Sequence, residues 1–522
     1  MLFMTDTGSK QFRHVLSETH WVRIAAWLVA AVAFLNALGF VIRCSNPVIQ
    51  SDAWYFLDVF LSKAVDGSLG IADFFVKRAG LDHAQPLFKL EMLLEWRYFG
   101  LDFTVGAVIG VIAAAASAAI LYRLTVAGER DRAVRYLACV AMCAVLFSLN
   151  GYGMTWTWPL VALENVTNLI ILLFMLAVWH AHRSQRYLML TIVTLLLGIS
   201  SDDSALIAVA VTVVVLLLAQ FSDPEQRRSS TWKLLTVLAA CMLLVRVGYR
   251  YAPVTGLSIT TSHHFGLLIE RFRTGGWWQW VALPLILPVS YSNISAHIST
   301  TAWVGIQAVM AMFLLATHVW FWWRALRGKY NQSVFVAVCL MALSYAWVAG
   351  IIFGRVSING NDYLYQQRYV LLYSGHLLAL LLMWATSHKA LPEALSRHRM
   401  AVAWIPIAGC VFLLLVQIPL SRHSWQQRPY LWAYYNRMAQ QIDDLAKDPA
   451  NVTGCLPELS VCGWPLETRR SLTHILSDNH LNVFSPQVQH RHRYLPHLLP
   501  LPVQPATTIQ STQRSNATVP SL

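Results

Sequence analysis

Long apolar runs, separated by short polar stretches, make up most of the chain. A helix that spans a bilayer needs roughly 20 apolar residues, or somewhat fewer where neighbouring helices shield its ends. Eleven runs qualify, near residues 21–42, 103–126, 133–150, 160–181, 187–200, 204–221, 232–248, 302–325, 332–354, 368–387 and 400–419. A shorter run at 277–290 contains two prolines, which indicates a re-entrant or interfacial segment. The pattern predicts an all-α polytopic membrane protein with about eleven transmembrane helices.

The composition supports this class of protein. Of the 522 residues, 56% are hydrophobic and only 12% are charged. Such a chain cannot cover a water-facing surface with polar groups and needs lipid as part of its solvent. The first apolar run is too long for the apolar region of a signal peptide, and no small-residue cleavage site follows it. We therefore expect this run to be the first transmembrane helix.

The net charge of +13 raises the question of a nucleic-acid partner. Cytoplasmic loops of membrane proteins carry an excess of lysine and arginine. This excess predicts a cytoplasmic N-terminus and an extracytoplasmic C-terminal tail, in a membrane of the bacterial inner type. Topology explains most of the charge, and we expect no nucleic-acid partner. The basic residues lie in alternate short loops, at 10–23, 123–135, 183–186, 227–233, 324–329 and 389–399.

The longest segment expected on the outer side, residues 43–102, follows the first span directly. Within it Leu87, Leu90, Leu94 and Tyr98 recur at helical spacing, and the polar residues occupy other positions around the helix. This pattern predicts an amphipathic helix that lies on the membrane surface.

On this interpretation the chain has three parts. Residues 1–420 form the transmembrane domain. Residues 421–490 form a small, mixed extracytoplasmic region with a helix at 429–447. Residues 491–522 are rich in proline, serine and threonine, and we expect them to be disordered.

Two local features predict contacts. The tail contains Cys455 and Cys462, which can pair in an oxidising compartment, although their spacing leaves a disulfide open. A stripe of small residues on the second apolar run predicts close helix packing. The residues of this stripe are Gly106, Gly110, Ala114 and Ala118.

Ionisable side chains at membrane depth are costly, so they are functional hypotheses by default. On the predicted topology, most of the few present lie at the outer membrane boundary. A carboxylate there can deprotonate a hydroxyl as general base, and a guanidinium can bind phosphate and stabilise its growing charge. The pattern favours a reaction between a phosphate-bearing lipid and a hydroxyl acceptor. The candidate site residues are Asp52, Asp82, His83, Glu164, Asp202, Asp203, Arg355, Arg368 and Tyr369.

Each candidate also has a structural interpretation. Asp52 can cap a short loop helix, and Asp82 with His83 can cap a helix that begins near Pro86. Glu164 can pair with an arginine. The two adjacent carboxylates in the outer turn can keep that turn hydrated, and the two arginines can be anchors that reach lipid headgroups.

In layout, residues 20–420 resemble the GT-C superfamily of membrane glycosyltransferases, particularly bacterial members linked to surface polysaccharides. The resemblance rests on a first span, a long outer loop with an early acidic residue at Asp52, and many further spans. Shorter similarities are an acidic-His element before QPLFKL, a GR…QQRY pattern around a late outer loop, and HILSDNHLNVFSP in the tail.

The resemblance implies a polyprenyl-phosphate-linked sugar donor, a glycan or lipid-linked acceptor, and a site at the outer face of the membrane, in contact with membrane lipid. It implies an acidic catalytic base in the first loop, with Asp52 as first candidate and Asp82 as second. Some members hold a divalent metal such as Mg²⁺ or Mn²⁺ with carboxylates. The first loop has no clear DxD motif, so the metal and its ligands stay open.

Three other functions stay open. A flippase or transporter for a lipid-linked polysaccharide needs charged or broken helices at mid-depth and often an internal repeat, and the sequence shows no clear repeat and few mid-span charges. A polysaccharide polymerase or ligase would share outer arginines and lipid-linked substrates with a transferase. A non-catalytic envelope assembly protein would tolerate alanine at the outer carboxylates.

Overall fold

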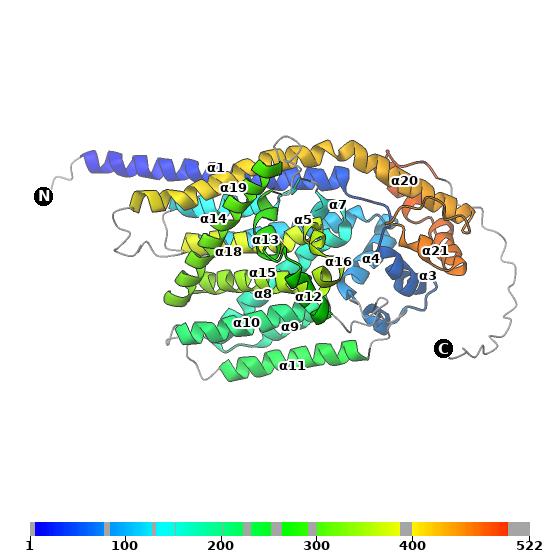
Figure 1. Ribbon diagram of the computed structural model, residues 1–522, viewed down its shortest axis with the longest axis horizontal. Helices are drawn as coiled ribbons and strands as arrows, with labels where there is room; N and C mark the ends of the chain where they lie inside the picture. Colours follow the sequence, from blue (N-terminus) through cyan, green and yellow to red (C-terminus); the bar gives the residue numbers. More distant parts are fainter. Residues whose placement is uncertain are drawn as a thin grey trace.

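The computed structural model describes residues 6–77, 84–127, 132–151, 153–200, 202–222, 231–251, 264–290, 300–386 and 399–498. The elements in these ranges are helices (Figure 1). The α-helices are α1 (Asp6–Cys44), α2 (Ala53–Phe56), α3 (Ser62–Val65), α4 (Pro86–Phe99), α5 (Thr104–Val126), α6 (Arg132–Leu146), α7 (Met154–Thr157), α8 (Pro159–Ser184), α9 (Leu188–Ser200), α10 (Asp202–Ser222), α11 (Thr231–Arg250), α12 (His264–Arg273), α13 (Gln279–Ser290), α14 (Thr300–Arg327), α15 (Gln332–Ile351), α16 (Ser357–Asn359), α17 (Val370–Tyr373), α18 (Gly375–Thr386), α19 (Arg399–Gln426), α20 (Arg428–Lys447), α21 (Leu466–Asp478) and α22 (Pro486–Arg491). Short helical turns used below are η2 (Ile71–Phe75), η5 (Ile352–Val356), η6 (Asn361–Tyr365) and η7 (Gln367–Tyr369).

The long helices run side by side along one axis of an elongated bundle, with α1 and α19 along one edge and α11 along the opposite edge (Figure 1). Within the described residues, nine helices are long and apolar enough to cross a membrane. The protein is therefore an all-helical membrane protein with many spans. The nine candidate spans are Trp21–Cys44, Thr104–Val126, Pro159–Ser184, Ser204–Phe221, Thr231–Arg250, Val304–Arg327, Gln332–Asn359, Gln367–Thr386 and Ile405–Lys447.

These spans correspond to nine of the eleven apolar runs in the sequence. The other two runs, 133–150 and 187–200, form the shorter helices α6 and α9, of 15 and 13 residues. A helix of 13 residues is only about 20 Å long, less than the hydrocarbon thickness of a bilayer. The proline-containing run at 277–290 forms α13, with Pro284 and Pro288 inside it. Within the described residues, nine of the eleven predicted spans therefore have the length and composition of a membrane-crossing helix.

The stripe of small residues on α5 brings that helix close to two neighbours. A Cβ atom added at Gly110 would collide with the carbonyl oxygen of Ala162 on α8. A Cβ atom added at Gly106 would collide with a carboxylate oxygen of Glu91 on α4. The close packing predicted from the stripe is therefore present, and α5 is the helix on which α4 and α8 are assembled.

The two ends of the bundle differ in composition. At one end, called here the arginine end, α1, α5 and α6 carry Arg23, Arg123, Arg132 and Arg135. At the other, called here the tail end, the segment 45–103 packs against the tail, 428–498 (Figure 1). Side chains from both segments form one apolar cluster, including Trp54, Phe88, Met438, Leu476 and Phe484. The tail is thus part of the same core as the first loop.

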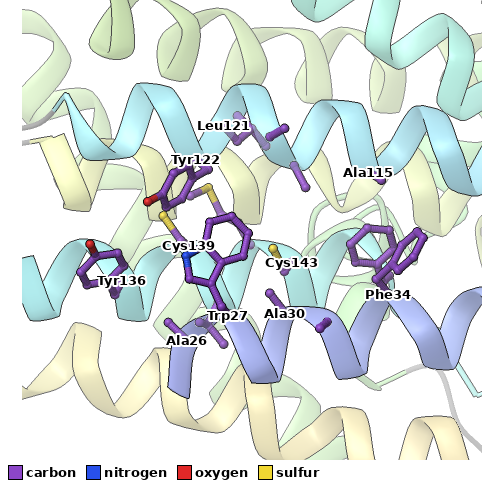
Figure 2. Close-up of a pocket in the computed structure, with 16 residues that line it drawn as sticks. Ala26, Trp27, Ala30, Phe34, Ala115, Leu121, Tyr122, Tyr136, Cys139 and Cys143 are labelled. Atoms are coloured by element: carbon purple, nitrogen blue, oxygen red, sulfur yellow. The ribbon is translucent and has the colours of Figure 1, made fainter. Parts of the chain in front are cut away.

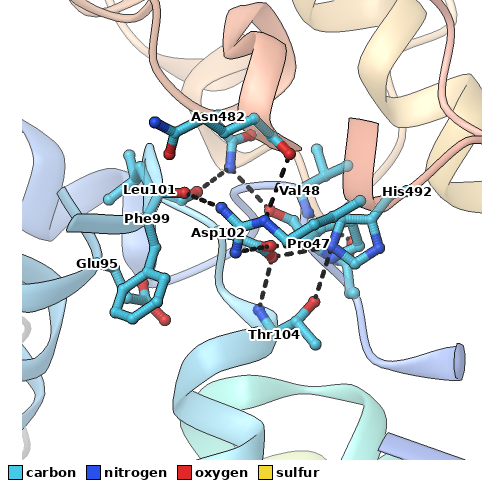
Figure 3. Close-up of polar contacts among 12 residues, drawn as sticks. Pro47, Val48, Glu95, Phe99, Leu101, Asp102, Thr104, Asn482 and His492 are labelled. Atoms are coloured by element: carbon cyan, nitrogen blue, oxygen red, sulfur yellow. Dashed lines mark hydrogen bonds and ion pairs between the residues drawn. The ribbon is translucent and has the colours of Figure 1, made fainter. Parts of the chain in front are cut away.

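Polar contacts join the tail to the first loop (Figure 3). The amide nitrogen of Asn482, which is completely buried, donates to the carbonyl oxygens of Pro47 and Leu101 at 2.8 and 2.7 Å. Its amide oxygen accepts from the backbone N–H of Ile49 at 3.0 Å. Because all three partners are backbone groups of the loop, one asparagine holds two separate stretches of it.

A buried carboxylate makes the second connection. Asp102, only 1% exposed, lies 2.8 Å from Nη1 of Arg491 and 3.0 Å from Nε2 of His492. It also accepts from the backbone N–H of Thr104 at 3.1 Å. The contacts between the tail and the first loop therefore extend past residue 490, to Arg491 and His492. Residues 499–522 lie outside the described part of the chain.

The tail is also closed by a covalent bond. The helix expected at 429–447 is present as α20, and a disulfide joins Cys455 to Cys462. The disulfide, which the sequence left open, closes the turn between α20 and α21. Glu458, inside this turn, accepts from the backbone N–H of Ser51 at 2.6 Å through its carbonyl oxygen. The disulfide-bonded turn therefore contacts the residue that precedes Asp52.

Candidate functional site

Arg368 lies at the tail end among aromatic rings. Its guanidinium carbon is 5.1, 5.6 and 6.0 Å from the ring centroids of Tyr369, Tyr363 and Trp158. One terminal nitrogen donates to the hydroxyl of Tyr363 at 2.5 Å. The buried Nε has no hydrogen-bond partner among the described groups. A guanidinium held by rings keeps its charge and retains donors for an anion.

The backbone connects Arg368 to the segment that carries Asp52. Trp158, whose ring faces the guanidinium, follows Thr157 at the start of α8. The carbonyl oxygen of Thr157 accepts from the backbone N–H of Asn46 at 2.9 Å. The segment that carries Asp52 and the side chain of Arg368 therefore both contact the α7–α8 junction, at Thr157 and Trp158.

Asp52 stands immediately before α2 and is half-buried. Its side chain makes no capping hydrogen bond to α2, so the capping role considered above does not account for it. Glu164 is also half-buried, in the second turn of α8. Ala53 and Leu163, the neighbours of these two acids, belong to one apolar cluster. Both carboxylates are therefore on segments that contribute to the apolar core of the tail end.

The structure places the other candidates as follows. Arg355, in η5, is exposed and within electrostatic range of the Tyr369 hydroxyl. Asp202 begins α10 directly after α9, which packs against α4, and the side chains of Asp202 and Asp203 lie outside the described part. The structure thus brings Arg355, Arg368 and Tyr369 together. The roles of Asp202 and Asp203 stay predictions.

Asp82 and His83 both lie outside the described residues. The cap of α4 is Gln85, in the left-handed conformation, and Pro86 is the first helical residue.

Three charged side chains of α4, those of Lys89, Glu91 and Glu95, are buried and were not selected from the sequence. Lys89 is completely buried, and its ammonium donates to the carbonyl oxygens of Asp73, Phe74 and Val76 at 2.9, 3.0 and 2.7 Å. Three acceptors match its three donors, so Lys89 fixes η2 against α4. Burial lowers the pKa of Lys89 to about 7.

Two carboxyl groups lie one turn apart further along α4. Glu91 is 4% exposed, and Glu95 is completely buried and accepts from the backbone N–H of Gly106 at 3.1 Å. Burial raises the pKa of Glu91 to about 7. Burial and the adjacent Glu91 carboxyl raise the pKa of Glu95 well above its usual range. Ionising two adjacent buried carboxyl groups together has a high free-energy cost. The pair therefore holds a proton near neutral pH.

The sequence contained a signal for this pair. The four-residue spacing of Glu91 and Glu95 places them on the helix face of Phe88 and Met92, which are both buried. The predicted apolar face is real, because Leu90, Leu94 and Tyr98 are 48%, 44% and 67% exposed. In a membrane protein an exposed apolar face points toward lipid, so the acids point into the protein.

A second polar group, also missed, lies inside the bundle. Nε2 of His318 on α14 is 3.1 Å from Nδ1 of His376 on α18, and both side chains are buried. Nδ1 of His318 lies 2.8 Å from the hydroxyl of Tyr345 on α15. His318 precedes Arg327 by nine residues, or about 14 Å of helix, which corresponds to mid-depth. Because histidine is uncharged in its neutral form, a search of the sequence for charged residues within the spans does not find this pair.

Metal ligands can be tested only in part. Among the described residues, no three His, Cys, Asp or Glu side chains gather in a way that could hold a metal ion. Asp82 and His83 are not covered by this finding. The residues of the tail end thus supply a carboxylate, a guanidinium and tyrosine hydroxyls, a set that suits proton transfer to Asp52 and anion binding at Arg368. Comparisons of the chain with protein-family models, curated proteins and solved structures found no match.

Proposed function

We propose that this chain is a glycosyltransferase of a bacterial inner membrane, with a GT-C-like fold, a cytoplasmic N-terminus and an extracytoplasmic tail end. It would move a sugar from a polyprenyl-phosphate donor to a glycan or lipid-linked acceptor. One observation carries the proposal. Arg368 is held by three aromatic rings and keeps a buried donor available, and both it and the segment that bears Asp52 contact the α7–α8 junction.

In this proposal Asp52 accepts the proton of the acceptor hydroxyl as general base. The hydroxyl oxygen forms a bond to the anomeric carbon of the donor sugar, and the bond from that carbon to the phosphate oxygen breaks. The electron pair stays on the phosphate oxygen, where Arg368 stabilises the charge. Arg355 and Tyr369 would contribute further donors. Asp82, the second candidate base, would act from the same loop.

The test measures lipid-linked and surface glycans by mass spectrometry in cells that lack this protein. Cells without the protein should make a glycan that is short by one sugar. Rescue with the wild type should restore the missing sugar, and rescue with Asp52→Ala or Arg368→Ala should not. The matched control is Asp66→Ala, which removes an exposed carboxylate from the same loop. All variants should reach the membrane in equal amounts. Full rescue by Asp52→Ala would remove this residue as the base.

A second candidate function is transport of a lipid-linked glycan, with coupling to protons. The hydrogen-bonded pair of His318 and His376 favours it, because ionisable residues at mid-depth mark proton and substrate pathways in transporters. In the same experiment a transporter predicts that a complete lipid-linked glycan accumulates inside the cell. An unaltered glycan profile would count against both functions and favour an assembly protein.

A further inference from the structure

A cavity of about 260 Å³ lies between α1, α5 and α6, away from the tail end (Figure 2). Alanines of α1 and α5 leave the cavity open because they are too small to fill the space between the three helices. Its wall also includes the aromatic rings of Trp27, Phe34 and Tyr122 and the thiols of Cys139 and Cys143. The alanines are Ala26, Ala30, Ala31, Ala115, Ala118 and Ala119.

The depth of the cavity restricts its contents. Its wall is made by α1 and α5, both candidate spans, so it lies at the level of the lipid hydrocarbon. A wall made mostly of alanine, aliphatic and aromatic side chains offers water few hydrogen-bond partners. A flexible hydrocarbon chain gains contact with the wall and leaves no polar group unpaired. The chemistry of the cavity therefore fits a lipid chain.

Charged groups gather where the cavity approaches the arginine end. The rings of Trp27 and Tyr122, which both line the cavity, pack against each other with their centroids 5.1 Å apart. Arg23 is one turn of α1 beyond Trp27, Arg123 follows Tyr122, and Arg135 precedes Tyr136, which also lines the cavity. Arginine binds phosphate through parallel hydrogen bonds. Basic pockets between transmembrane helices are typical sites for anionic headgroups.

We propose that this cavity is a binding site for an anionic phospholipid. One acyl chain lies between α1, α5 and α6, and the headgroup phosphate lies at Arg23, Arg123 and Arg135. The opposite signs of phosphate and arginine orient the lipid, and the apolar wall holds its chain. The cavity contains none of the candidate site residues and lies toward the opposite end of the bundle from them, so this lipid is a resident lipid and not the sugar donor.

The test uses phosphatidylglycerol with a diazirine in one acyl chain, added to the full-length protein in nanodiscs. Irradiation followed by peptide mass spectrometry should place labels on α1, α5 and α6 at the cavity. The same probe with a phosphatidylcholine headgroup should label these peptides several-fold less. Equal labelling by both probes would overturn the role of the arginines.

Two matched variants separate the cavity from ordinary lipid contact. Ala118→Phe fills the cavity and should reduce its labelling several-fold. Val32→Phe adds the same ring to α1 at a position that is 65% exposed, and should leave labelling unchanged. If Ala118→Phe fails to fold, Ala30→Val provides a smaller filling change. Unchanged labelling in the folded filling variant would overturn the site. Displacement by polyprenyl phosphate, but not by excess phosphatidylglycerol, would overturn the assignment to a phospholipid.

Discussion

Glu91 and Glu95 lie one turn apart on α4, and the fold keeps both carboxyl groups away from water. A buried carboxylate loses its hydration, and a second carboxyl beside it adds repulsion, so the neutral form is favoured. The cost of this arrangement depends on pH. It can therefore be measured through the stability of the protein.

The expected pH dependence follows from proton binding. The pKa of Glu91 is about 7 in the folded protein and lies near its usual value of 4.5 in the unfolded chain. The folded state binds more protons between these values, so its stability is fully present below the lower pKa and is lost as pH rises through the higher one. Glu91 alone should contribute a loss on the order of 3 kcal/mol, and Glu95, whose pKa is also raised, adds to it.

Glu91→Gln should remove the part of this dependence that comes from Glu91, because a neutral amide has no proton to lose, while Glu95 keeps its own part. The thermal unfolding midpoint in detergent, measured from about pH 5 to about pH 8, checks this. Glu467→Gln is the matched control, since the side chain of Glu467 is 80% exposed. A wild-type midpoint that stays constant, or rises with pH, would contradict the buried pair.

For single residues, the sequence identifies candidates at the outer membrane boundary, but it does not identify the residues that contact them in the fold. Asp52 and Arg368 were found because charge is rare in an apolar chain, and their roles stay predictions. His492 and Asp102 are 390 positions apart, and only the folded tail makes them partners. Charges that pair across such separations leave no local pattern.

Among the helices, the contact between α5 and α8 depends on the missing side chain of Gly110. The Ala162 carbonyl oxygen occupies the place where a Cβ atom would lie. Close backbone approach of this kind replaces side-chain interdigitation in membrane helices. The sequence predicted this contact because small residues four positions apart lie on one face of the helix, and a face without large side chains lets a neighbouring helix come close.

Gly110→Ala should lower the stability of the folded protein by about 1–3 kcal/mol, because the added methyl group must force α5 and α8 apart. Gly248→Ala adds the same group on α11, where nothing lies within 4 Å, and should be neutral or slightly stabilising. Unfolding midpoints of both variants in one detergent give the comparison. Equal midpoints would show that the contact can relax without cost.

The lengths of the helices were harder to predict than their existence. The runs that became α6 and α9 are as apolar as the others, but they end after 15 and 13 residues. Hydropathy reports where a helix can be buried in lipid or protein. It does not report how far neighbouring helices shield a shorter one, which is a property of the packed bundle.

On the scale of the whole molecule, the first loop and the tail form a single unit. Their apolar side chains share one cluster, and the connections of Asn482 and Asp102 cross it. The disulfide-bonded turn also reaches back to Ser51, since Ser460 donates to its carbonyl oxygen at 2.9 Å. If Asp52 is the base, as proposed, the tail holds the backbone beside it. The division of the chain at residue 420 did not predict this unit, because contacts between distant segments leave no signal in composition.

This dependence can be measured by releasing the tail. Asn482→Ala leaves three buried backbone groups of the first loop without partners, each at a cost of about 1–3 kcal/mol. A loss of about 3 kcal/mol would raise the undocked population roughly a hundredfold. Limited trypsin digestion of the protein in detergent should then cut the tail much faster than in the wild type. Asn479→Ala, which removes an exposed amide from the same region, should be cut at the wild-type rate. Equal rates in both variants would mean that the apolar cluster alone holds the tail, and Asn482 would then have no role in positioning the segment that contains Asp52.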